Sequence, residues 1–264
     1  MRRLFVRSGG GMPGIDMHIG YWLALEQAGI EATECIGTSA GAIVSALDAS
    51  GMKASDAKII VSRLTDKDIR KERWFWKWRS AFYINWFLSN DPIKKLFKDL
   101  LPQNGRDYKK KCRVCAMRWK DCEPVYFSTT NTSFNYRDCV LASMSIAGVF
   151  PRVKLGDEEY SDGGPRDNIP VPTYIDDYDE VWVLIASAVP DSYKGRDTII
   201  TALKRQADAL MYDQPCDIVD RYASNPKVRI VWMRARTPNG ALHFDHNLIE
   251  EAYHFARHEI KRWL

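Results

Sequence analysis

The chain has 264 residues, of which 45% are hydrophobic and 27% are charged, and its formal net charge at pH 7 is +4. This is the composition of an ordinary globular protein, without a repeat or a low-complexity tract. No stretch approaches the roughly 18 consecutive apolar residues of a membrane-spanning helix, and the apolar run at residues 4–6 is too short for a secretory signal. We therefore expect a soluble, cytoplasmic protein whose mild positive charge is compatible with an anionic surface as a partner.

The first fifty residues alternate between strand and helix patterns. Short apolar runs end in Gly-rich turns, and each turn is followed by apolar side chains at helical spacing. This alternation predicts an α/β domain on a mainly parallel sheet. The expected elements are a strand at 3–8, a loop at 8–14, a helix that stops at Gly29, a strand at 33–36, a turn at 37–41 and a helix to about residue 50.

The turn Gly37-Thr38-Ser39-Ala40-Gly41 has the strand–turn–helix context of a nucleophile elbow. Such a turn pushes the hydroxyl of its serine clear of the backbone, and its two glycines stand where a side chain would collide with a neighbouring element. The helix behind the turn directs its N-terminal N–H groups toward any negative charge that forms there. We predict that Ser39 is an enzyme nucleophile rather than part of an ordinary Gly-rich turn.

The Gly-rich loop has three interpretations. Gly9-x-Gly11-x-x-Gly14 matches the dinucleotide-binding fingerprint, with Glu31 or Glu34 near the position of a ribose-binding acid, but that leaves the elbow unexplained. The loop could also be only a tight turn. In the third interpretation, unobstructed backbone N–H groups form an oxyanion hole. We favour the third, because both Gly motifs end adjacent strands of one βαβ unit and therefore open on the same edge of the sheet.

We expect residues 66–104 to form an irregular helical elaboration, in which the sequence of Arg70–Phe87 interleaves Arg and Lys with Trp, Phe and Tyr. Such a mixture suits a bilayer interface, where the rings lie at headgroup depth and the cations meet anionic lipid. The same segment could stack on single-stranded nucleic acid, or pack its rings inward with the charges solvated. Inward packing is the common outcome for such runs, with a lipid-facing wall as its close alternative, and no nucleic-acid partner is expected. Peripheral membrane contact through Arg70–Phe87 is our hypothesis.

The rest of the chain continues the alternation without a linker or a break in composition, so we expect a single domain over residues 1–264. Asp162-Gly163-Gly164 forms a rigid corner at a strand end, which taken alone indicates a structural turn. The expected elements are strands at 113–119, 124–129, 181–187 and 227–233, a short helix turning into a loop at 139–151, and helices at 197–222 and 247–264.

Four of the six cysteines lie near one another in the sequence, and Cys112-x-x-Cys115 has the spacing of zinc ligands. The surrounding residues alternate as in a strand, and no second Cys-x-x-Cys or His pair supplies the remaining ligands. No clustered carboxylate loop indicates calcium. We therefore predict reduced cysteines on a strand, and neither a metal nor another cofactor. The four are Cys112, Cys115, Cys122 and Cys139.

Four sequence blocks, in the expected order, together resemble the patatin-like phospholipases over nearly the whole chain. They are Gly9-Gly10-Gly11-Met12-Pro13-Gly14 as a Gly-rich oxyanion loop, Gly37–Gly41 as the elbow, Ala142–Pro151 as a pocket wall, and Asp162-Gly163-Gly164 with Asn168 and Pro170 as an Asp-Gly-Gly corner. One block would be a weak signal, whereas four in order are specific. The resemblance implies a three-layer α/β/α fold with a mainly parallel central sheet.

The family uses a Ser–Asp dyad without a histidine. Carried over, Ser39 is the nucleophile and Asp162 is the base that accepts its proton, as part of a serine acyl hydrolase that cleaves lipid esters through an acyl-enzyme, of phospholipase A or lysophospholipase type. A carboxylate is a weaker base than imidazole. More of the rate enhancement must therefore come from stabilisation of the oxyanion by the loop amides, chiefly those of Gly10 and Gly11. The implied oxyanion loop is Gly9, Gly10, Gly11 and Gly14, and the implied supporting glycines are Gly37, Gly41, Gly163 and Gly164.

The chain departs from the family pattern at two positions. Pro13 stands where the family commonly has Arg or Lys, and Ala147 stands where a Pro is common. Neither position belongs to the dyad. They bear on the headgroup of the substrate more than on the type of reaction.

Other functions stay open. Ser39, Asp162 and His243 or His246 follow the chain order of an α/β-hydrolase triad. Against a triad, the elbow comes too early for that fold, and we expect the two histidines to open the last helix or to line a surface loop. An acyltransferase would use the same nucleophile, and a lipid-binding module would keep the fold without turnover. His18 falls within the first helix, where we expect it to be packed or solvated.

Overall fold

One sheet organises the described part of the chain, which comprises residues 1–69, 88–131, 133–189, 214–237 and 242–264 of this computed structural model. The strands are β1 (Arg3–Arg7), β2 (Glu34–Thr38), β3 (Lys111–Arg118), β4 (Pro124–Ser128), β5 (Val153–Leu155), β6 (Glu158–Asp162), β7 (Glu180–Val189) and β8 (Val228–Arg236). Seven of these eight strands lie in the order β5-β6-β3-β2-β1-β7-β8, and the eighth, β4, pairs with β3.

Parallel pairing joins the central strands β3, β2, β1, β7 and β8. Antiparallel pairing is confined to one end of the described sheet, where β4 and β6 pair with β3 and β5 pairs with β6. The parallel strands are covered on both faces, which explains the continuous apolar run Val181–Ala186 in β7. The predicted α/β fold with a mainly parallel sheet is confirmed.

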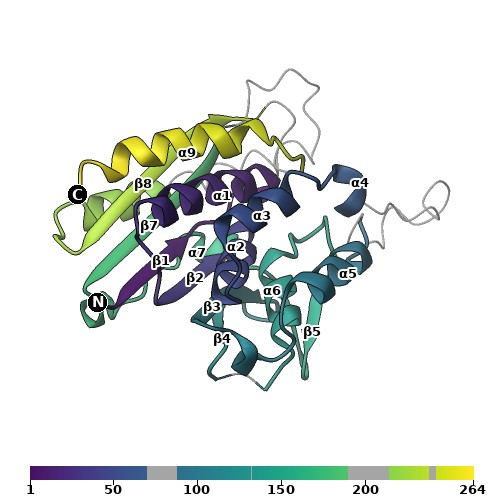
Figure 1. Ribbon diagram of the computed structural model, residues 1–264. Helices are drawn as coiled ribbons and strands as arrows, with labels where there is room; N and C mark the ends of the chain where they lie inside the picture. Colours follow the sequence, from purple (N-terminus) through teal and green to yellow (C-terminus); the bar gives the residue numbers. More distant parts are fainter. Residues whose placement is uncertain (70–87, 132, 190–213, 238–241) are drawn as a thin grey trace, which may run out of the picture.

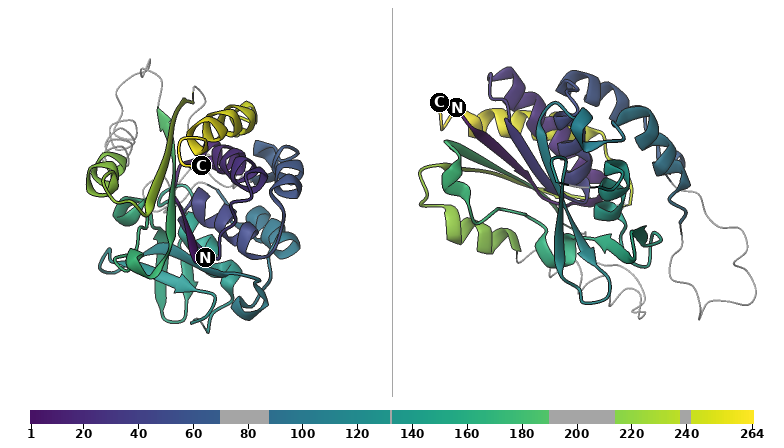
Figure 2. Two further views of the ribbon diagram at one scale, coloured as in Figure 1. Left: turned by 60° about the vertical axis from the view of Figure 1, so that its left-hand side comes forward. Right: turned by 90° about the horizontal axis from the view of Figure 1, so that it is seen from below.

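Helices cover both faces of this sheet (Figures 1 and 2). On one face α1 packs against α9, and α2 packs against β1, β2 and β3. The other face carries α7 and the helical residues 214–222. The helices are α1 (Gly11–Gln27), α2 (Ala40–Ala49), α3 (Ala54–Val61), α4 (Asp66–Ile69), α5 (Asp91–Leu100), α6 (Tyr136–Met144), α7 (Gly164–Asp167) and α9 (Asn247–Ile260).

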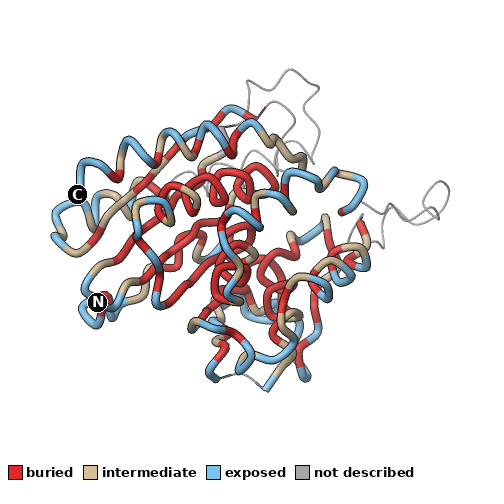
Figure 3. Tube along the Cα trace, viewed as in Figure 1, coloured by how far each residue is buried: buried red, intermediate tan, exposed pale blue. Residues whose placement is uncertain are grey.

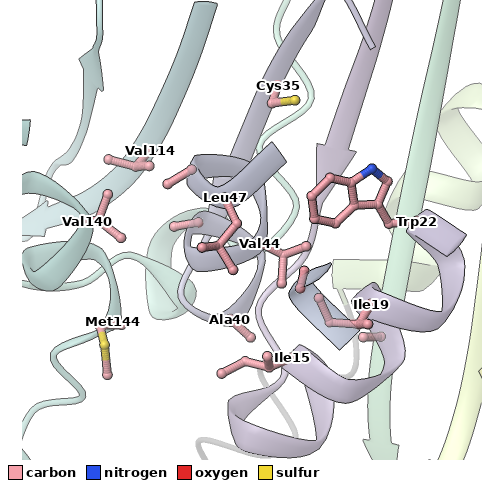
Figure 4. Packing of buried hydrophobic residues seen from close by; sticks show 14 of the residues in the cluster. Ile15, Ile19, Trp22, Cys35, Ala40, Val44, Leu47, Val114, Val140 and Met144 are labelled. Carbon is pink, nitrogen blue, oxygen red and sulfur yellow. The ribbon is translucent and has the colours of Figure 1, made fainter. Parts of the chain in front are cut away.

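Two apolar cores lie on opposite faces of the sheet, because successive side chains of a strand alternate between its faces. Phe5 of β1 belongs to the larger core with α1, α2, α6 and α9, part of which is drawn in Figure 4. Its neighbours Leu4 and Val6 belong to the smaller core, against which Ile218 and Tyr222 pack. Burial is most continuous along the central strands, α1 and α2 (Figure 3).

Helix α1 begins at Gly11, so the loop expected at 8–14 was predicted too long. The Gly14 amide donates to the Gly10 carbonyl at 3.1 Å and closes the first helical turn. Pro13 lies inside that turn, where a missing N–H costs nothing because the first amides of a helix have no partner within it. The Gly-rich loop is therefore confined to Ser8–Gly10.

Several expectations concern parts of the chain that are only partly described. Arg70–Phe87 and most of the helix expected at 197–222 lie outside the described residues, although 214–222 are helical. The elaboration expected at 66–104 contains α4 and α5 at its ends. Strand β5 was not predicted. Among the described helices, none combines the length and the apolar character that crossing a bilayer would require.

A buried ion network joins β1, α2 and the residue before β3. Arg7 ends β1 and Asp48 lies in the last turn of α2, both side chains are fully buried, and their Nη2 and Oδ2 atoms are 2.7 Å apart. Lys110, which is partly exposed, reaches the other oxygen of Asp48 at 2.7 Å. Burial would raise the pKa of Asp48, but the two cations more than offset it and hold this pKa below its ordinary value.

We predict that Asp48→Ala lowers the free energy of unfolding by about 3–5 kcal/mol, because it leaves the Arg7 guanidinium buried without a counter-ion. Lys110→Ala should cost much less, since Arg7 still neutralises Asp48. Urea unfolding followed by circular dichroism measures both values. Equal losses in the two variants would show that the buried pair is not the dominant contribution.

Candidate active site

Ser39 occupies a tight turn between β2 and α2. Its backbone has φ 53° and ψ −119°, a strained conformation for a residue other than glycine. The turn is closed by backbone contact: a Cβ at Gly37 would lie 2.3 Å from the carbonyl oxygen of Gly41, and a Cβ at Gly41 would lie 2.3 Å from that of Arg7. Because no side chain fits at either glycine, the structure holds Ser39 in the geometry of a nucleophile elbow.

Strand β3 brings Asp162 to this elbow. Thr38, the residue before Ser39, pairs with Cys115 of β3 in the parallel direction. The next residue of β3, Ala116, pairs with Asp162 at the end of the antiparallel strand β6. Ser39 directly follows the end of β2, and Asp162 is the last residue of β6. Although 123 positions separate them in the sequence, both therefore lie beside the same part of β3.

The C-terminal end of α6 ties both residues to the same frame. The Ser143 hydroxyl accepts the amide of Ser39 at 3.1 Å and donates to the carbonyl of Cys115 at 2.6 Å. Two residues later, the carbonyl of Ser145 accepts the amide of Asp162 at 2.9 Å. The block predicted as a pocket wall thus also anchors the two candidate catalytic residues, a role that no sequence pattern indicated.

The carboxyl group of Asp162 is buried, and its two oxygens have different surroundings. Its Oδ1 accepts the amide of Gly164 at 2.7 Å, while Oδ2 has no hydrogen-bond partner within the part of the chain that the structure describes. Burial raises the pKa of Asp162 to about 6, although the nearby Ser39 hydroxyl and the Gly164 amide both act to lower it. Gly163 keeps this corner against β3, since a Cβ there would lie 2.5 Å from the Cys115 carbonyl oxygen. A carboxylate with a free oxygen beside a hydroxyl can accept that hydroxyl's proton.

The glycines expected to form an oxyanion hole divide into two pairs. Two amides are already used within the fold: that of Gly9 donates to the carbonyl of Asn168 at 3.0 Å, and that of Gly14 donates to Gly10. The amides of Gly10 and Gly11 donate to no acceptor among the described residues, and neither does the amide of Ala40 at the start of α2. The candidate donors are therefore Gly10 and Gly11, together with Ala40, which the sequence analysis did not name.

The histidines considered as triad members contact aspartates other than Asp162. His246 Nδ1 is 2.9 Å from Asp16 Oδ1, and His243 Nδ1 is 2.6 Å from Asp66 Oδ2. The groups that set the pKa of Asp162 are its burial, Ser39 and Gly164, and none of them is a histidine. His18 is fully buried with Nε2 2.7 Å from the carbonyl of Ser8, as expected for a packed histidine.

The cysteines of the Cys-x-x-Cys pattern lie on β3, as predicted, with both side chains buried. Burial raises the pKa of Cys112 to about 12 and that of Cys115 above its ordinary value, so both are thiols at neutral pH. Within the described ranges, no group of histidine, cysteine, aspartate and glutamate side chains is arranged to hold a metal ion.

We predict that Asp162→Asn stabilises the protein at pH 8, by an amount on the order of 1–3 kcal/mol, and leaves its stability unchanged near pH 4. The folded-state pKa of Asp162 lies above that of an unfolded aspartate, so its contribution to stability is complete at low pH and is lost as the pH rises through about 6. Asparagine keeps the shape and the acceptor for Gly164 without the buried charge. The measurement is urea unfolding from pH 4 to 8, with the exposed Asp157→Asn as the matched control. A pH-independent difference between wild type and Asp162→Asn would contradict it.

Two solved structures of other proteins have a similar fold. VipD from Legionella pneumophila superposes with a TM-score of 0.59 at 14% identity, covering 99% of this chain and 67% of VipD. ExoU of Pseudomonas aeruginosa, solved with SpcU, superposes with a TM-score of 0.52 at 15% identity, covering 99% of this chain and 52% of ExoU. Both likenesses concern the fold.

Comparison of the sequence with known proteins and with family models gives one relative and one family. The uncharacterized protein YqhO of Bacillus subtilis (strain 168) is 30% identical over 106 residues, which are 38% of this chain and 36% of YqhO. The chain thus spans less than half of YqhO and little more than half of ExoU. The family model of the patatin-like phospholipases matches residues 5–175, which include the Gly-rich loop, the elbow and the Asp162 corner. Since this match covers more than half of the chain, the protein belongs to the patatin-like phospholipase family.

Proposed function

We propose that this protein is a serine acyl hydrolase of lipid esters, with Ser39 as the nucleophile and Asp162 as the base. The observation that carries the proposal is the strained Ser39 elbow beside a buried carboxyl group whose Oδ2 has no hydrogen-bond partner among the described residues. Membership of the patatin-like phospholipase family supports the lipid ester as the substrate class. Phospholipase A or lysophospholipase activity is the finer form of this proposal.

In the first half of the reaction, the Oγ of Ser39 attacks the ester carbonyl carbon as its proton moves to Oδ2 of Asp162. The negative charge that develops on the carbonyl oxygen would be met by the unpaired amides of Gly10, Gly11 and Ala40 and by the N-terminus of α2. The carbon–oxygen bond to the alcohol then breaks, and the alcohol leaves with the proton from Asp162. An acyl group remains on Ser39.

In the second half, water attacks the acyl carbon while Asp162 accepts a proton from it. The bond to Ser39 breaks, Ser39 regains its proton, and the fatty acid leaves. The raised pKa of Asp162 helps here, because a base whose pKa of about 6 lies near neutrality accepts a proton more readily than an ordinary carboxylate does. An acyl acceptor other than water would make the same chemistry an acyltransferase.

The decisive test is hydrolysis of p-nitrophenyl esters and phospholipid vesicles. We predict that Ser39→Ala and Asp162→Asn each lose at least about a thousandfold in kcat/KM, since each removes a group that acts on the reacting atoms. Asp167→Asn, a half-buried carboxylate five residues further on, should keep activity within about threefold, as should the double variant His243→Asn/His246→Asn.

The outcomes separate the alternatives. Loss of activity in the folded double histidine variant would favour a Ser–Asp–His triad. Transfer of the acyl group to an added alcohol in place of water would identify an acyltransferase. A folded wild-type protein that binds vesicles but hydrolyses no ester would be a lipid-binding module.

We also propose peripheral membrane contact through Arg70–Phe87, on the basis of its sequence alone. Replacing Trp74, Trp76, Trp78 and Trp86 by alanine should lower activity on vesicles at least about tenfold and leave hydrolysis of a soluble short-chain ester unchanged, because only the vesicle requires interfacial rings. Replacement of the exposed Trp119 and Trp263 is the matched control. Equal losses on both substrates would contradict this role.

A further inference from the structure

The backbone of helix α7 contacts both the candidate base and the elbow. The amide of Gly164, the first residue of α7, donates to Oδ1 of Asp162 at 2.7 Å. At the other end of the helix, the carbonyl of Asp167 accepts the hydroxyl of Thr38, which directly precedes the candidate nucleophile, at 2.8 Å. The position of α7 therefore bears on both members of the candidate dyad.

The residue that follows α7 holds the Gly-rich loop. The carbonyl of Asn168 accepts the amide of Gly9 at 3.0 Å. The two residues also lie in direct contact, since a Cβ at Gly9 would lie 2.3 Å from Oδ1 of Asn168. The candidate oxyanion donors Gly10 and Gly11 come next in the chain, so α7 also bears on the place of their amides.

Helix α7 is too short to hold its shape by itself. It comprises only the four residues Gly164–Asp167, in which the amides of Arg166 and Asp167 both donate to the carbonyl of Gly163. A single helical turn is unstable in isolation, because it fixes many backbone angles for few hydrogen bonds. Contacts from other elements must therefore help to fix α7.

The side chain of Gln214 spans this turn. Its Nε2 donates to the carbonyl of Gly164 at 3.1 Å, and its Oε1 accepts the amide of Asn168 at 2.7 Å. In an α-helix the amide of residue i+4 donates to the carbonyl of residue i, so these are the two groups that close a helical turn. One side-chain amide thus bridges the beginning of α7 and the residue after its end.

Gln214 comes from a distant part of the chain. It is 50 positions from Gly164 and lies beyond residues 5–175, which the family model matches. It is half-buried and belongs to the helical residues 214–222, which lie on the same face of the sheet as α7 (Figure 2). A carboxamide suits this position, because its planar group carries a donor and an acceptor side by side.

We propose that Gln214 is a positioning residue of the reaction, which couples the base to the Gly-rich loop through α7. This inference rests on the proposed function, because it takes Asp162 as the base and the loop amides as the oxyanion donors. Through Gly164, Gln214 keeps an amide on Oδ1 of Asp162, which leaves Oδ2 to accept the proton. Through Asn168, it keeps Gly9 in place and with it the loop.

Loss of the bridge should change the pH dependence of the reaction in a definite direction. The amide of Gly164 stabilises the charged carboxylate and acts to lower the pKa of Asp162. If this hydrogen bond weakens, the pKa of Asp162 rises. The reaction requires the carboxylate form, so the acidic limb of kcat/KM should move to higher pH.

The test compares Gln214→Met with wild type on the soluble ester p-nitrophenyl butanoate between pH 4 and 8. Methionine has a similar length but cannot make the two hydrogen bonds. We expect kcat to fall about ten- to a hundredfold with KM within about twofold, because the displaced groups act on the reacting atoms. The acidic limb should rise by about half a pH unit or more. Labelling of Ser39 to completion with an alkyl fluorophosphonate counts the active sites, so that kcat is expressed per active site.

Two further variants complete the comparison. Asn225→Leu is the matched control, because the half-buried Asn225 also bonds a backbone amide, that of Lys227 at 3.0 Å, but lies just before β8 at the end of the sheet opposite the site. It should leave kcat and the pH profile unchanged. Gln214→Asn keeps a carboxamide that is one methylene too short to bridge both groups, so it should lose rate as Gln214→Met does. Because it stays polar, it provides the same test if the methionine variant does not fold.

The outcomes distinguish the two proposals. No hydrolysis of the ester by folded wild type would contradict the proposed function. With an active wild type, an unchanged kcat per active site and an unchanged pH profile in Gln214→Met would overturn the positioning role alone. A higher KM at unchanged kcat would overturn it too, because Gln214 would then contribute to substrate binding. The same holds for a loss of kcat that Asn225→Leu matches and that leaves the acidic limb in place.

Discussion

The site depends on the central position of strand β3. Its parallel neighbour β2 ends at Thr38, opposite Cys115, and its antiparallel neighbour β6 ends at Asp162, opposite Ala116. The carbonyl of Cys115 also accepts the hydroxyl of Ser143, which in turn accepts the amide of Ser39. Cys115 and Ala116, two successive residues of β3, therefore position both Ser39 and Asp162. Because this positioning uses backbone hydrogen bonds, the distance between the two residues is held more rigidly than side-chain contacts alone could hold it.

The same frame sustains two unfavourable local states. Ser39 is held in a strained conformation, and Asp162 is held in a buried position that disfavours its charged form. Such states persist only where the surroundings leave no alternative. Here Gly37 and Gly41 bring backbone segments into direct contact, and Arg7, whose carbonyl touches Gly41, is itself fixed by its buried pair with Asp48. Stability elsewhere in the core thus offsets the strain at the site.

Much of this arrangement could be predicted from the sequence because it depends on local patterns. The elbow needs glycines at fixed spacing from Ser39, and a parallel sheet needs alternating strands and helices. Both features can therefore be recognised in the sequence. The first turn of α1 was misplaced, because Gly11 to Gly14 suit a loop as well as a helix start. The short strand β5 was missed although its sequence carries a signal: Val153-Lys154-Leu155 alternates apolar and polar side chains, and Gly156-Asp157 is a two-residue hairpin turn to β6.

The rest depends on tertiary contacts that sequence spacing does not reveal. The bridge through Ser143 joins a helix to a strand and a turn that are distant in the chain. An apolar pocket is lined by residues of α1, α2, α5 and the segment around Phe244, and each of these residues looks like an ordinary core position in the sequence. His243 and His246 could be a triad partner from chain order alone, and the structure instead places them against Asp66 and Asp16.

The most direct test of the Ser39–Asp162 pair is the rate at which an alkyl fluorophosphonate labels Ser39 between pH 4 and 9, with the labelled residue identified by mass spectrometry. Labelling requires attack by the Ser39 hydroxyl and acceptance of its proton, without a later hydrolysis step. The account predicts that the wild-type rate falls as the pH drops through about 6, the pKa of Asp162, and that Asp162→Asn labels slowly at a rate that does not change in this range. Equal rates and the same pH profile in both proteins would contradict it.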